Sequence, residues 1–336
     1  MRIGVLTELS PAARYRVHYP LDAMQRRGHD IVWPNDDGSP RVDAFPSCDA
    51  LLVYRSHGSA VRNLLKRLRA SGIAIVWDND DDLRHLPRDR ATRRRAGGFS
   101  NQAIFDETAR TAKLAHVAIA TSEPIAAAYR GAGVRDVRVI ANYLASGTAR
   151  QARPHDGVVV GWIAGLEHAS DVQPLRLNET FRALQVEHPD LNVITIGVRL
   201  ALRERYRHAP HVVFDKLPAV MAGFDIGLAP LLDTPFNRAR SDIKIKEYAA
   251  SGVPWLASPV GPYAELGEDA GGRLVPVGSW HEVLNKLIGD ANARRHLAQT
   301  GRDWARGQTI DAVVDRYETA FADAVGRVGE AAFASA

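Results

Sequence analysis

The sequence predicts an α/β protein built from two Rossmann-like, doubly wound lobes around a cleft. Short apolar runs alternate with longer amphipathic stretches almost from end to end, a pattern typical of βα units and parallel sheets. The chain has 336 residues, and because a domain holds about 150 residues, two domains are expected. Residues 145–157 are rich in small and polar side chains and lack periodicity, so they are the best linker between the lobes.

Each half of the chain contains the strands of one sheet. In the first half the apolar runs lie at residues 2–6, 31–33, 50–54, 73–77, 117–120 and 137–140. In the second half they lie at residues 158–162, 192–196, 212–214, 225–229, 254–257 and 273–275. Amphipathic stretches such as 19–27 and 60–71 predict the helices that cover the sheets. We therefore expect a first lobe at 1–148, a second lobe at 149–308 and a terminal helical segment at 309–336.

Composition excludes several classes of protein. Hydrophobic residues make up 46% of the chain and charged residues 24%, which are values of a folded globular protein. The single cysteine, Cys48, can form no internal disulfide, and residues 1–6 read as a strand rather than a signal peptide. No stretch reaches the roughly 20 apolar residues that span a bilayer. We expect a cytoplasmic protein whose contact with a membrane, if it has one, is peripheral and at the inner face.

Common catalytic motifs are absent from the sequence. There is no G-x-G-x-x-G after the first strand and no G-x-x-x-x-G-K-[ST]. There is also no G-x-S-x-G and no H-E-x-x-H. Standard dinucleotide-binding domains, P-loop NTPases, hydrolases and metalloproteases are therefore disfavoured.

The most informative segment is residues 224–265, which read as a strand, a polar loop, a helix over 241–251 and another strand. Ser241 and Asp242 are good N-cap residues. A helix that starts beyond the carboxyl end of a strand offers free N–H groups and a positive dipole to a phosphate, and Arg240 lies just before it.

Lys244 and Glu247 share one face of this predicted helix because they are three residues apart. A cation there could meet a phosphate, and the carboxylate could accept hydrogen bonds from two sugar hydroxyls. An ordinary capped helix with an ion pair explains the same spacing equally well.

Several segments resemble one family. Residues 246–261, KEYAASGVPWLASPVG, resemble the nucleotide-sugar signature of GT-B glycosyltransferases of the family 4, or group 1, type. Residues 159–171, VVGWIAGLEHASD, resemble the first strand and turn of that family's second lobe. Residues 139–143, VIANY, and 271–275, GGRLV, resemble the end of its first lobe and the strand after its donor site. The resemblance covers nearly the whole chain and implies the GT-B fold and glycosyl transfer.

The resemblance implies roles for the helix over 241–251. Glu247 matches the second glutamate of the family's E-x7-E motif, which holds the ribose hydroxyls of the donor nucleotide. The helix start at 241–243 matches the backbone cradle for the diphosphate, with Arg240 and Lys244 as its charge partners.

The chain departs from the family pattern at Ala239, where the first glutamate of the motif would stand. That glutamate ordinarily contacts the transferred sugar, so the donor sugar is not specified. Asn237 or Asp242 is the candidate to take over its contact.

The family also keeps basic residues near the turn after the first strand of its second lobe. In this chain the turn contains Gly165 and His168, and the usual Arg and Lys are missing. His168, and Arg199 after the next strand, are the candidates to neutralise the leaving diphosphate. A solvent-facing loop residue is the alternative for each.

First-lobe candidates follow predicted strands, since ligands of open α/β sheets bind beyond the carboxyl ends of the strands. Arg14, Tyr15 and Arg16 follow the first strand, and Arg55 and His57 follow the strand over 50–54. The arginines could hold an anionic acceptor or the donor phosphates, and His57 could act as a base.

Aspartates gather after the strand over 73–77, at 78 and 80–82. Hard cations prefer carboxylates, but such a cluster can equally cap a helix or orient acceptor hydroxyls. The resemblance implies no catalytic metal, so we expect none and take Asp80 as the acceptor-side carboxylate. The basic run at 84–95 that follows is either a solvated loop or a clamp for an anionic acceptor.

The motifs and the resemblance together predict a transfer of sugar from a nucleoside diphosphate sugar, most commonly a UDP-sugar in this family, to a hydroxyl-bearing acceptor. A glycan, a lipid-linked molecule or a small molecule fits as acceptor, whereas nucleic acid is disfavoured because the basic run lacks interleaved aromatic residues. The resemblance implies retention of anomeric configuration without a cofactor. The alternatives are a sugar-nucleotide epimerase and a nucleotide-sugar-binding protein without catalysis, the latter because of Ala239.

Overall fold

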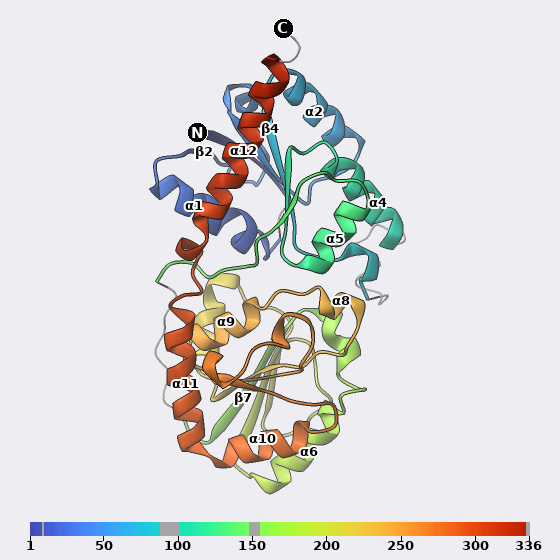
Figure 1. Cartoon of the computed structure of the whole chain (residues 1–336). Helices are drawn as coiled ribbons and strands as arrows, with labels where there is room; N and C mark the ends of the chain where they lie inside the picture. Colours follow the sequence, from blue (N-terminus) through green and yellow to red (C-terminus); the bar gives the residue numbers. More distant parts are fainter. Residues whose placement is uncertain (9, 88–100, 148–154, 334–336) are drawn as a thin grey trace.

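The computed structural model describes residues 1–8, 10–87, 101–147 and 155–333. These residues form two lobes, each built around a six-stranded parallel sheet (Figure 1). The expected boundary at 148/149 lies outside the described residues, as do residues 88–95 of the basic run. Among the helices that the structure describes, none is both long and apolar enough to cross a membrane.

The first sheet has the strand order β2-β1-β3-β4-β5-β6. Its strands are β1 (Arg2–Thr7), β2 (Asp30–Val32), β3 (Ala50–Tyr54), β4 (Ala74–Asn79), β5 (Val117–Ala120) and β6 (Val137–Val139). Helices α1 (Tyr19–Arg26) and α12 (Val314–Phe333) contribute to the core on one face. Helices α2 (Ser59–Ala70), α4 (Asn101–Ala112) and α5 (Glu123–Gly131) contribute to the core on the other. Strands covered on both faces bury nearly every side chain, which is why they read as apolar runs.

The second sheet has the strand order β12-β11-β10-β7-β8-β9. Its strands are β7 (Val158–Ala164), β8 (Leu191–Gly197), β9 (Tyr206–Ala209), β10 (Ile226–Ala229), β11 (Trp255–Ala257) and β12 (Gly272–Leu274). Its helices are α6 (Leu177–Glu187), α7 (Leu217–Met221), α8 (Pro235–Arg238), α9 (Ile243–Ala250), α10 (Trp280–Gly289) and α11 (Ala291–Ala305).

The strand predicted at 212–214 is wrong. The strand in this part of the chain is β9, an edge strand whose sequence, YRHA, is too polar to stand out as an apolar run. Val212 packs against the core of the second lobe from a segment without regular structure, and Phe214 starts a short 3-10 turn. Val212 therefore serves packing and not strand pairing, whereas Val213 is exposed.

The strand order of each sheet reverses at one point. In the first sheet β1 lies between β2 and β3, and in the second sheet β7 lies between β8 and β10. Ligands of open parallel sheets bind in the crevice outside the carboxyl ends of the strands at such switch points. The loops after β1 and β3, and those after β7 and β10, are therefore where a ligand site is expected.

Two chain crossings connect the lobes and lie side by side. The backbone N–H of Leu144 donates to the Gln308 carbonyl at 3.0 Å, and that of Ile310 donates to the Leu144 carbonyl at 2.8 Å. After the second crossing, α12 runs along the first lobe (Figure 1), where Tyr317 and Phe321 are buried in its core. The end of the chain is thus part of the first lobe's packing.

Arg16 is fully buried next to these crossings. Its Nε and Nη2 donate to the two carboxylate oxygens of Asp78, at the end of β4, at 2.8 and 2.7 Å. Its Nη1 donates to the Ile140 carbonyl at 2.6 Å and to Asn142 Oδ1 at 3.2 Å. Burial alone would lower the pKa of Arg16, but Asp78, together with Tyr317 and Asp80, raises it overall. Arg16 therefore ties β4 to the segment that leads from β6 into the linker.

A half-buried histidine makes the stability of the first lobe depend on pH. The backbone N–H of Ile75, in β4, donates to His116 Nδ1 at 2.9 Å. Burial, and then the charges of Arg69 and Arg327, lower the pKa of His116 to about 4. Because the unfolded chain takes up this proton near pH 6.5 and the folded chain only near pH 4, stability is complete above pH 6.5 and falls as the pH drops towards 4.

The substitution His116→Asn is expected to reduce this loss of stability between pH 6.5 and pH 4. Asparagine keeps an oxygen acceptor for the Ile75 N–H but takes up no proton. Urea unfolding at a series of pH values measures the effect. If the free energy of unfolding fell with pH as steeply in the variant as in the wild type, His116 would not be the titrating group.

Candidate active site

The lobes meet through polar contacts between loops at the carboxyl ends of their strands. From the loop after β1, Arg14 lies 3.5 Å from Asp215 of the second lobe. Ser122 Oγ, just before α5, donates to the Ala239 carbonyl at 2.9 Å. Ala239 itself packs into the core of the first lobe. The site described below is therefore a closed cleft between the lobes.

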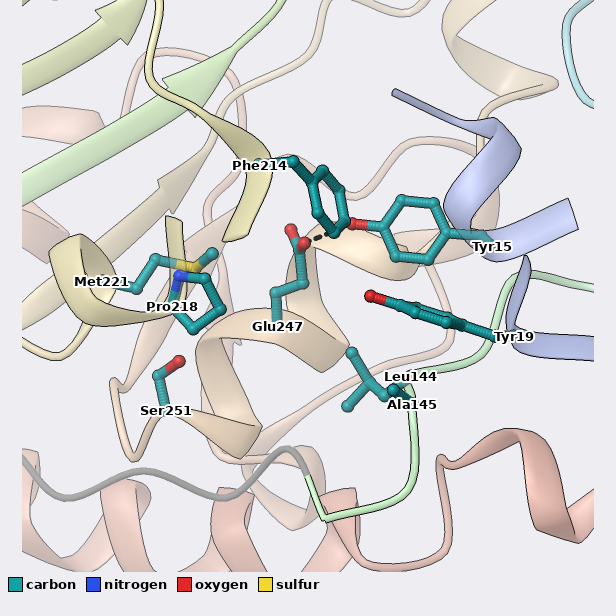
Figure 2. A pocket seen from close by; sticks show the side chains of 9 residues that line it. All are labelled: Tyr15, Tyr19, Leu144, Ala145, Phe214, Pro218, Met221, Glu247 and Ser251. Carbon is teal, nitrogen blue, oxygen red and sulfur yellow. Dashed lines mark hydrogen bonds between the residues drawn. The ribbon is translucent and has the colours of Figure 1, made fainter. Parts of the chain in front are cut away.

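Helix α9 presents Glu247 to this cleft. The side chain is 8% exposed, and its Oε2 accepts a hydrogen bond from Lys244 Nζ at 2.6 Å. Its Oε1 accepts from the hydroxyl of Tyr15, in the turn after β1 (Figure 2). Burial, and then the charge of Glu247, raise the pKa of Tyr15 well above its usual value, so the phenol keeps the proton that it donates. Glu247 thus accepts a hydrogen bond from a hydroxyl of the opposite lobe.

A small pocket of about 30 Å³ adjoins Glu247, enough for water but not for a nucleotide. Figure 2 shows aromatic side chains gathered around it: the ring of Tyr15 lies edge-on to those of Tyr19 and Phe214, with centroids 5.6 and 5.5 Å apart. The lining residues are Tyr15, Tyr19, Leu144, Ala145, Phe214, Pro218, Met221, Glu247 and Ser251. Both lobes therefore contribute to the walls, and a larger ligand needs the lobes to separate.

The turn after β7 brings a carboxylate and a guanidinium together. Gly165 lies so close to the Glu167 carboxylate that an ideal Cβ at this position would be 2.2 Å from Oε2. Oε1 of Glu167 lies 3.4 Å from Arg240, which also donates to Asp81 of the first lobe at 3.1 Å. Burial alone would lower the pKa of Arg240, but Asp81 and Glu167 raise it.

His168, in the same turn, is buried and forms a pair with Asp171. His168 Nδ1 lies 2.9 Å from Asp171 Oδ2. The Asp171 carboxylate also accepts from Asn237 Nδ2 at 3.3 Å. Asn237, a candidate for contact with the donor sugar, therefore has its amide engaged with Asp171 and with the Leu232 carbonyl.

The ends of β3 and β4 form the opposite wall. Arg55 has a positive φ of 55°, which is strained for a residue other than glycine. Its Nε donates to Asp80 Oδ1 at 2.7 Å, and its Nη2 donates to Asp81 at 2.5 Å. Tyr54 also donates to Asp80, at 2.8 Å. Burial would raise the pKa of Asp81, but Arg55 and Arg240 lower it overall, so this carboxylate is held charged between two cations.

The aspartates that follow β4 do not converge. Asp78 pairs with Arg16, Asp80 with Arg55 and Asp82 with Arg84. Within the described ranges, no group of three or more His, Cys, Asp or Glu side chains is placed to hold a metal ion. The cluster read from the sequence is therefore divided among different arginines. Asp81 shares Arg55 with Asp80 and also pairs with Arg240.

Other predicted residues are scattered around the cleft. Ser241 Oγ accepts from the Ile243 N–H at 3.2 Å, whereas Asp242 pairs with Lys246 at 3.0 Å and makes no side-chain cap. Arg199 is exposed on the loop after β8. Arg16 is buried beside the chain crossings, where it bonds groups of the chain itself. His57 is exposed, with Nδ1 2.9 Å from the Arg55 carbonyl, and its proposed role as a base stays a prediction.

Several residues of the cleft were not named as individual site candidates in the sequence analysis, although Asp81 belongs to the aspartate cluster described there. They are Tyr54, Asp81, Glu167, Asp171 and Asp215. The spacing of His168 and Asp171, three residues apart, could have indicated their pairing on one face of a turn. Nothing local could have indicated Asp215, because its partner Arg14 lies in the other lobe.

Comparison with solved structures finds the same two-lobed architecture. Anabaena Alr3699/HepE, solved with UDP and glucose, is 15% identical, with 96% of this chain and 99% of that chain covered and a TM-score of 0.66. Sucrose-phosphate synthase from Thermosynechococcus elongatus is 14% identical over 100% of both chains, with a TM-score of 0.64. An alpha-glucosyltransferase, solved with UDP and a 13-mer DNA containing an HMU base, is 11% identical over 97% and 99%, with a TM-score of 0.67.

The chain matches no protein-family model and no curated protein sequence. Sequence identities of 11–15% to these structures show the fold of the chain and not its activity. Membership of family 4 in particular stays a prediction. The strand orders and the likeness in three dimensions agree, and the fold expected from the sequence is confirmed: the chain has the GT-B fold of these glycosyltransferases.

Proposed function

We propose that the chain is a glycosyltransferase that moves a sugar from a UDP-sugar to a hydroxyl group of an acceptor. The placement of Glu247 carries the proposal: a buried carboxylate beside Lys244, in the cleft, that already accepts from the hydroxyl of Tyr15. A carboxylate so placed is equipped to accept hydrogen bonds from ribose hydroxyls. UDP is present in the HepE and alpha-glucosyltransferase complexes, which supports this donor class.

The donor diphosphate fits between the turn after β7 and the start of α9. The Glu167 carboxylate already lies there as an internal anion, against Gly165 and next to Arg240. When the bond between the sugar C1 and the β-phosphate oxygen breaks, negative charge grows on the departing UDP. Fixed cations such as Arg240 and Lys244, and the N–H groups at the start of α9, stabilise that charge with little reorganisation.

The acceptor belongs to the side of the cleft formed by the first lobe. Its hydroxyl oxygen forms the new bond to the sugar C1 as the bond to UDP breaks, and the hydroxyl proton passes to the departing β-phosphate oxygen. The wall formed by Arg55 and Asp80 is placed to orient this hydroxyl. Transfer without a metal belongs to the proposal, because Arg240 and Lys244 lie at the proposed diphosphate position. Retention of the anomeric configuration is proposed from the family resemblance alone. A glycan, a lipid-linked molecule or a small molecule remains the acceptor class.

The proposal is tested by binding and by product analysis. Calorimetric titration with UDP, GDP and ADP, with and without EDTA, is expected to show UDP as the tightest ligand and no effect of EDTA. Incubation of UDP-sugars with an acceptor panel is then expected to give a glycosylated acceptor and free UDP. A donor whose sugar is altered without acceptor would instead identify an epimerase. A chain that binds no nucleoside diphosphate would refute the proposal.

The substitution Tyr15→Phe is expected to tighten UDP binding several-fold. It removes the hydroxyl that competes for Glu247 and keeps the ring that packs against Tyr19 and Phe214. Tyr206→Phe is the matched control, because its hydroxyl lies 2.8 Å from Thr195 Oγ1 in the second lobe. Calorimetry on both variants gives the answer, and equal or weaker affinity of Tyr15→Phe would show that the hydroxyl does not compete with the donor.

A further inference from the structure

Asp171 is a buried carboxylate that joins the two sides of the second lobe's switch point. It ends the 3-10 turn Leu166–Asp171 that follows β7, and it is 2% exposed. Its Oδ1 accepts from the Leu232 N–H at 3.4 Å and from Asn237 Nδ2 at 3.3 Å, both in the segment after β10. A carboxylate removed from water and held by three donors is fixed in position before any ligand arrives.

The third donor is the imidazole of His168, which is 6% exposed. A carboxylate only accepts hydrogen bonds, so the hydrogen of the 2.9 Å bond between His168 Nδ1 and Asp171 Oδ2 lies on Nδ1. The other ring nitrogen, Nε2, lies 4.0 Å from Glu167 Oε1. Arg240 contacts the same carboxylate oxygen of Glu167. The Nε2 side of the ring, which Asp171 leaves available, therefore faces the Glu167 carboxylate.

We infer that Asp171 is a positioning residue of the donor site, which orients His168 so that Nε2 meets the departing diphosphate. The inference rests on the proposed function. With Nδ1 bound to Asp171, the ring can rotate only by breaking that bond. The ring is therefore oriented before a ligand binds, and binding spends no free energy on orienting it. Protonated on Nε2 as well, the ring donates a hydrogen bond to a phosphate oxygen, and Asp171 balances its positive charge.

Asn237 completes the arrangement by holding Asp171 rather than a sugar. Its Nδ2 donates to the Leu232 carbonyl at 2.9 Å as well as to the Asp171 carboxylate. The loop after β10, the aspartate and the histidine thus form one chain of hydrogen bonds. This explains why three polar side chains are buried together at the carboxyl ends of β7 and β10.

The test compares Asp171→Asn, His168→Gln and the double variant, with UDP and with uridine as ligands. Each single substitution is expected to weaken UDP binding about tenfold, the size of one hydrogen bond to a charged group. The double variant is expected to be no weaker than the poorer single variant, because both changes remove the same contact. Uridine has the base and ribose but no phosphate, so its affinity is expected to stay the same in all three.

A spectroscopic reading separates positioning from folding. The long-range ¹H–¹⁵N spectrum of His168, assigned by its loss in His168→Gln, is expected to show hydrogens on both ring nitrogens in the UDP complex of the wild type. In Asp171→Asn the ring is expected to carry a single hydrogen, because no carboxylate is left to balance a positive charge on it. Asp225→Asn is the control: Asp225 accepts from Val159 N–H at 2.7 Å and lies 3.5 Å from His155, at the strand ends away from the cleft.

Three outcomes would overturn the inference. Equal UDP affinity of wild type and Asp171→Asn would show that the carboxylate does not act on the diphosphate. Equal losses for UDP and uridine would show a structural role alone. Additive losses in the double variant would show that Asp171 and His168 act separately. A wild-type chain that binds no UDP overturns the proposed function itself, and the inference falls with it.

Discussion

Replacing Glu247 with alanine is expected to weaken UDP binding by about 100-fold or more. In the proposed complex the carboxylate accepts hydrogen bonds from two ribose hydroxyls. A hydrogen bond to a charged group contributes about 1.5–3 kcal/mol, so the loss of two corresponds to at least about 100-fold in affinity. The fold is expected to persist, because the side chain lies at the cleft and its partners Tyr15 and Lys244 regain water when the lobes open. Isothermal titration calorimetry measures the change.

Glu282→Ala is the matched control for this experiment. Glu282 also pairs with a lysine on its own helix, Lys286 in α10, at 2.6 Å, but both side chains are exposed outside the cleft. Its loss is expected to leave UDP affinity unchanged. If Glu247→Ala bound UDP as tightly as this control does, the helix over 243–250 would be an ordinary helix with an ion pair and the donor site would lie elsewhere.

Replacing Arg16 with methionine is expected to lower the free energy of unfolding of the first lobe by about 3–5 kcal/mol. The substitution leaves the Asp78 carboxylate buried without its cation, and the Ile140 carbonyl without its donor. Removing one partner of a buried ion pair costs this much because the remaining charge is desolvated and unpaired. Urea unfolding monitored by amide hydrogen exchange in β3 and β4 measures the stability of the first lobe separately from that of the second.

Two further variants identify the cause of that loss. Arg26→Met removes an exposed ion pair with Asp311, and is expected to cost at most about 1 kcal/mol. The double variant Arg16→Met/Asp78→Leu removes both buried charges, and is expected to recover much of the stability that the single variant loses. A single variant within about 1 kcal/mol of the wild type would contradict the buried ion pair as a main support of the lobe.

The strands were largely predictable because parallel strands covered on both faces are apolar along their whole length. The structured bounds of α1 and α2 lie within one residue of the predicted stretches 19–27 and 60–71. The exception, β9, lies at a sheet edge where none of its four residues is fully buried, so its sequence carries no apolar run. Local pattern therefore predicted the interior of each sheet better than its edges.

The site was predictable only where its residues are close in sequence. Lys244 and Glu247 share a helix face, and their spacing indicated it. The bond from Tyr15 to Glu247 joins residues 232 positions apart, and that from Asn237 to Asp171 joins residues 66 apart. Burial, too, depends on the fold: Arg16 resembles Arg14 in the sequence, yet only Arg16 lies in the core of its lobe. Such contacts follow from how the lobes close, which no local pattern describes.

In the closed cleft, the polar side chains of the proposed donor site bond other side chains of the same chain. The Tyr15 hydroxyl bonds Glu247 where a ribose hydroxyl is proposed, and the Glu167 carboxylate contacts Arg240 where a phosphate is proposed. Burying these charged groups without partners would be costly, so the internal contacts stabilise the closed form. Donor binding then has to replace each of them by an equivalent contact, which requires the lobes to open first.

The most direct test of the account is a crystal structure of the chain with UDP. The account predicts the ribose hydroxyls on the Glu247 carboxylate, Tyr15 displaced from it, and the diphosphate between the turn after β7 and the start of α9, with Arg240 released from Glu167. A structure in which Tyr15 still bonds Glu247 while UDP lies elsewhere would contradict it.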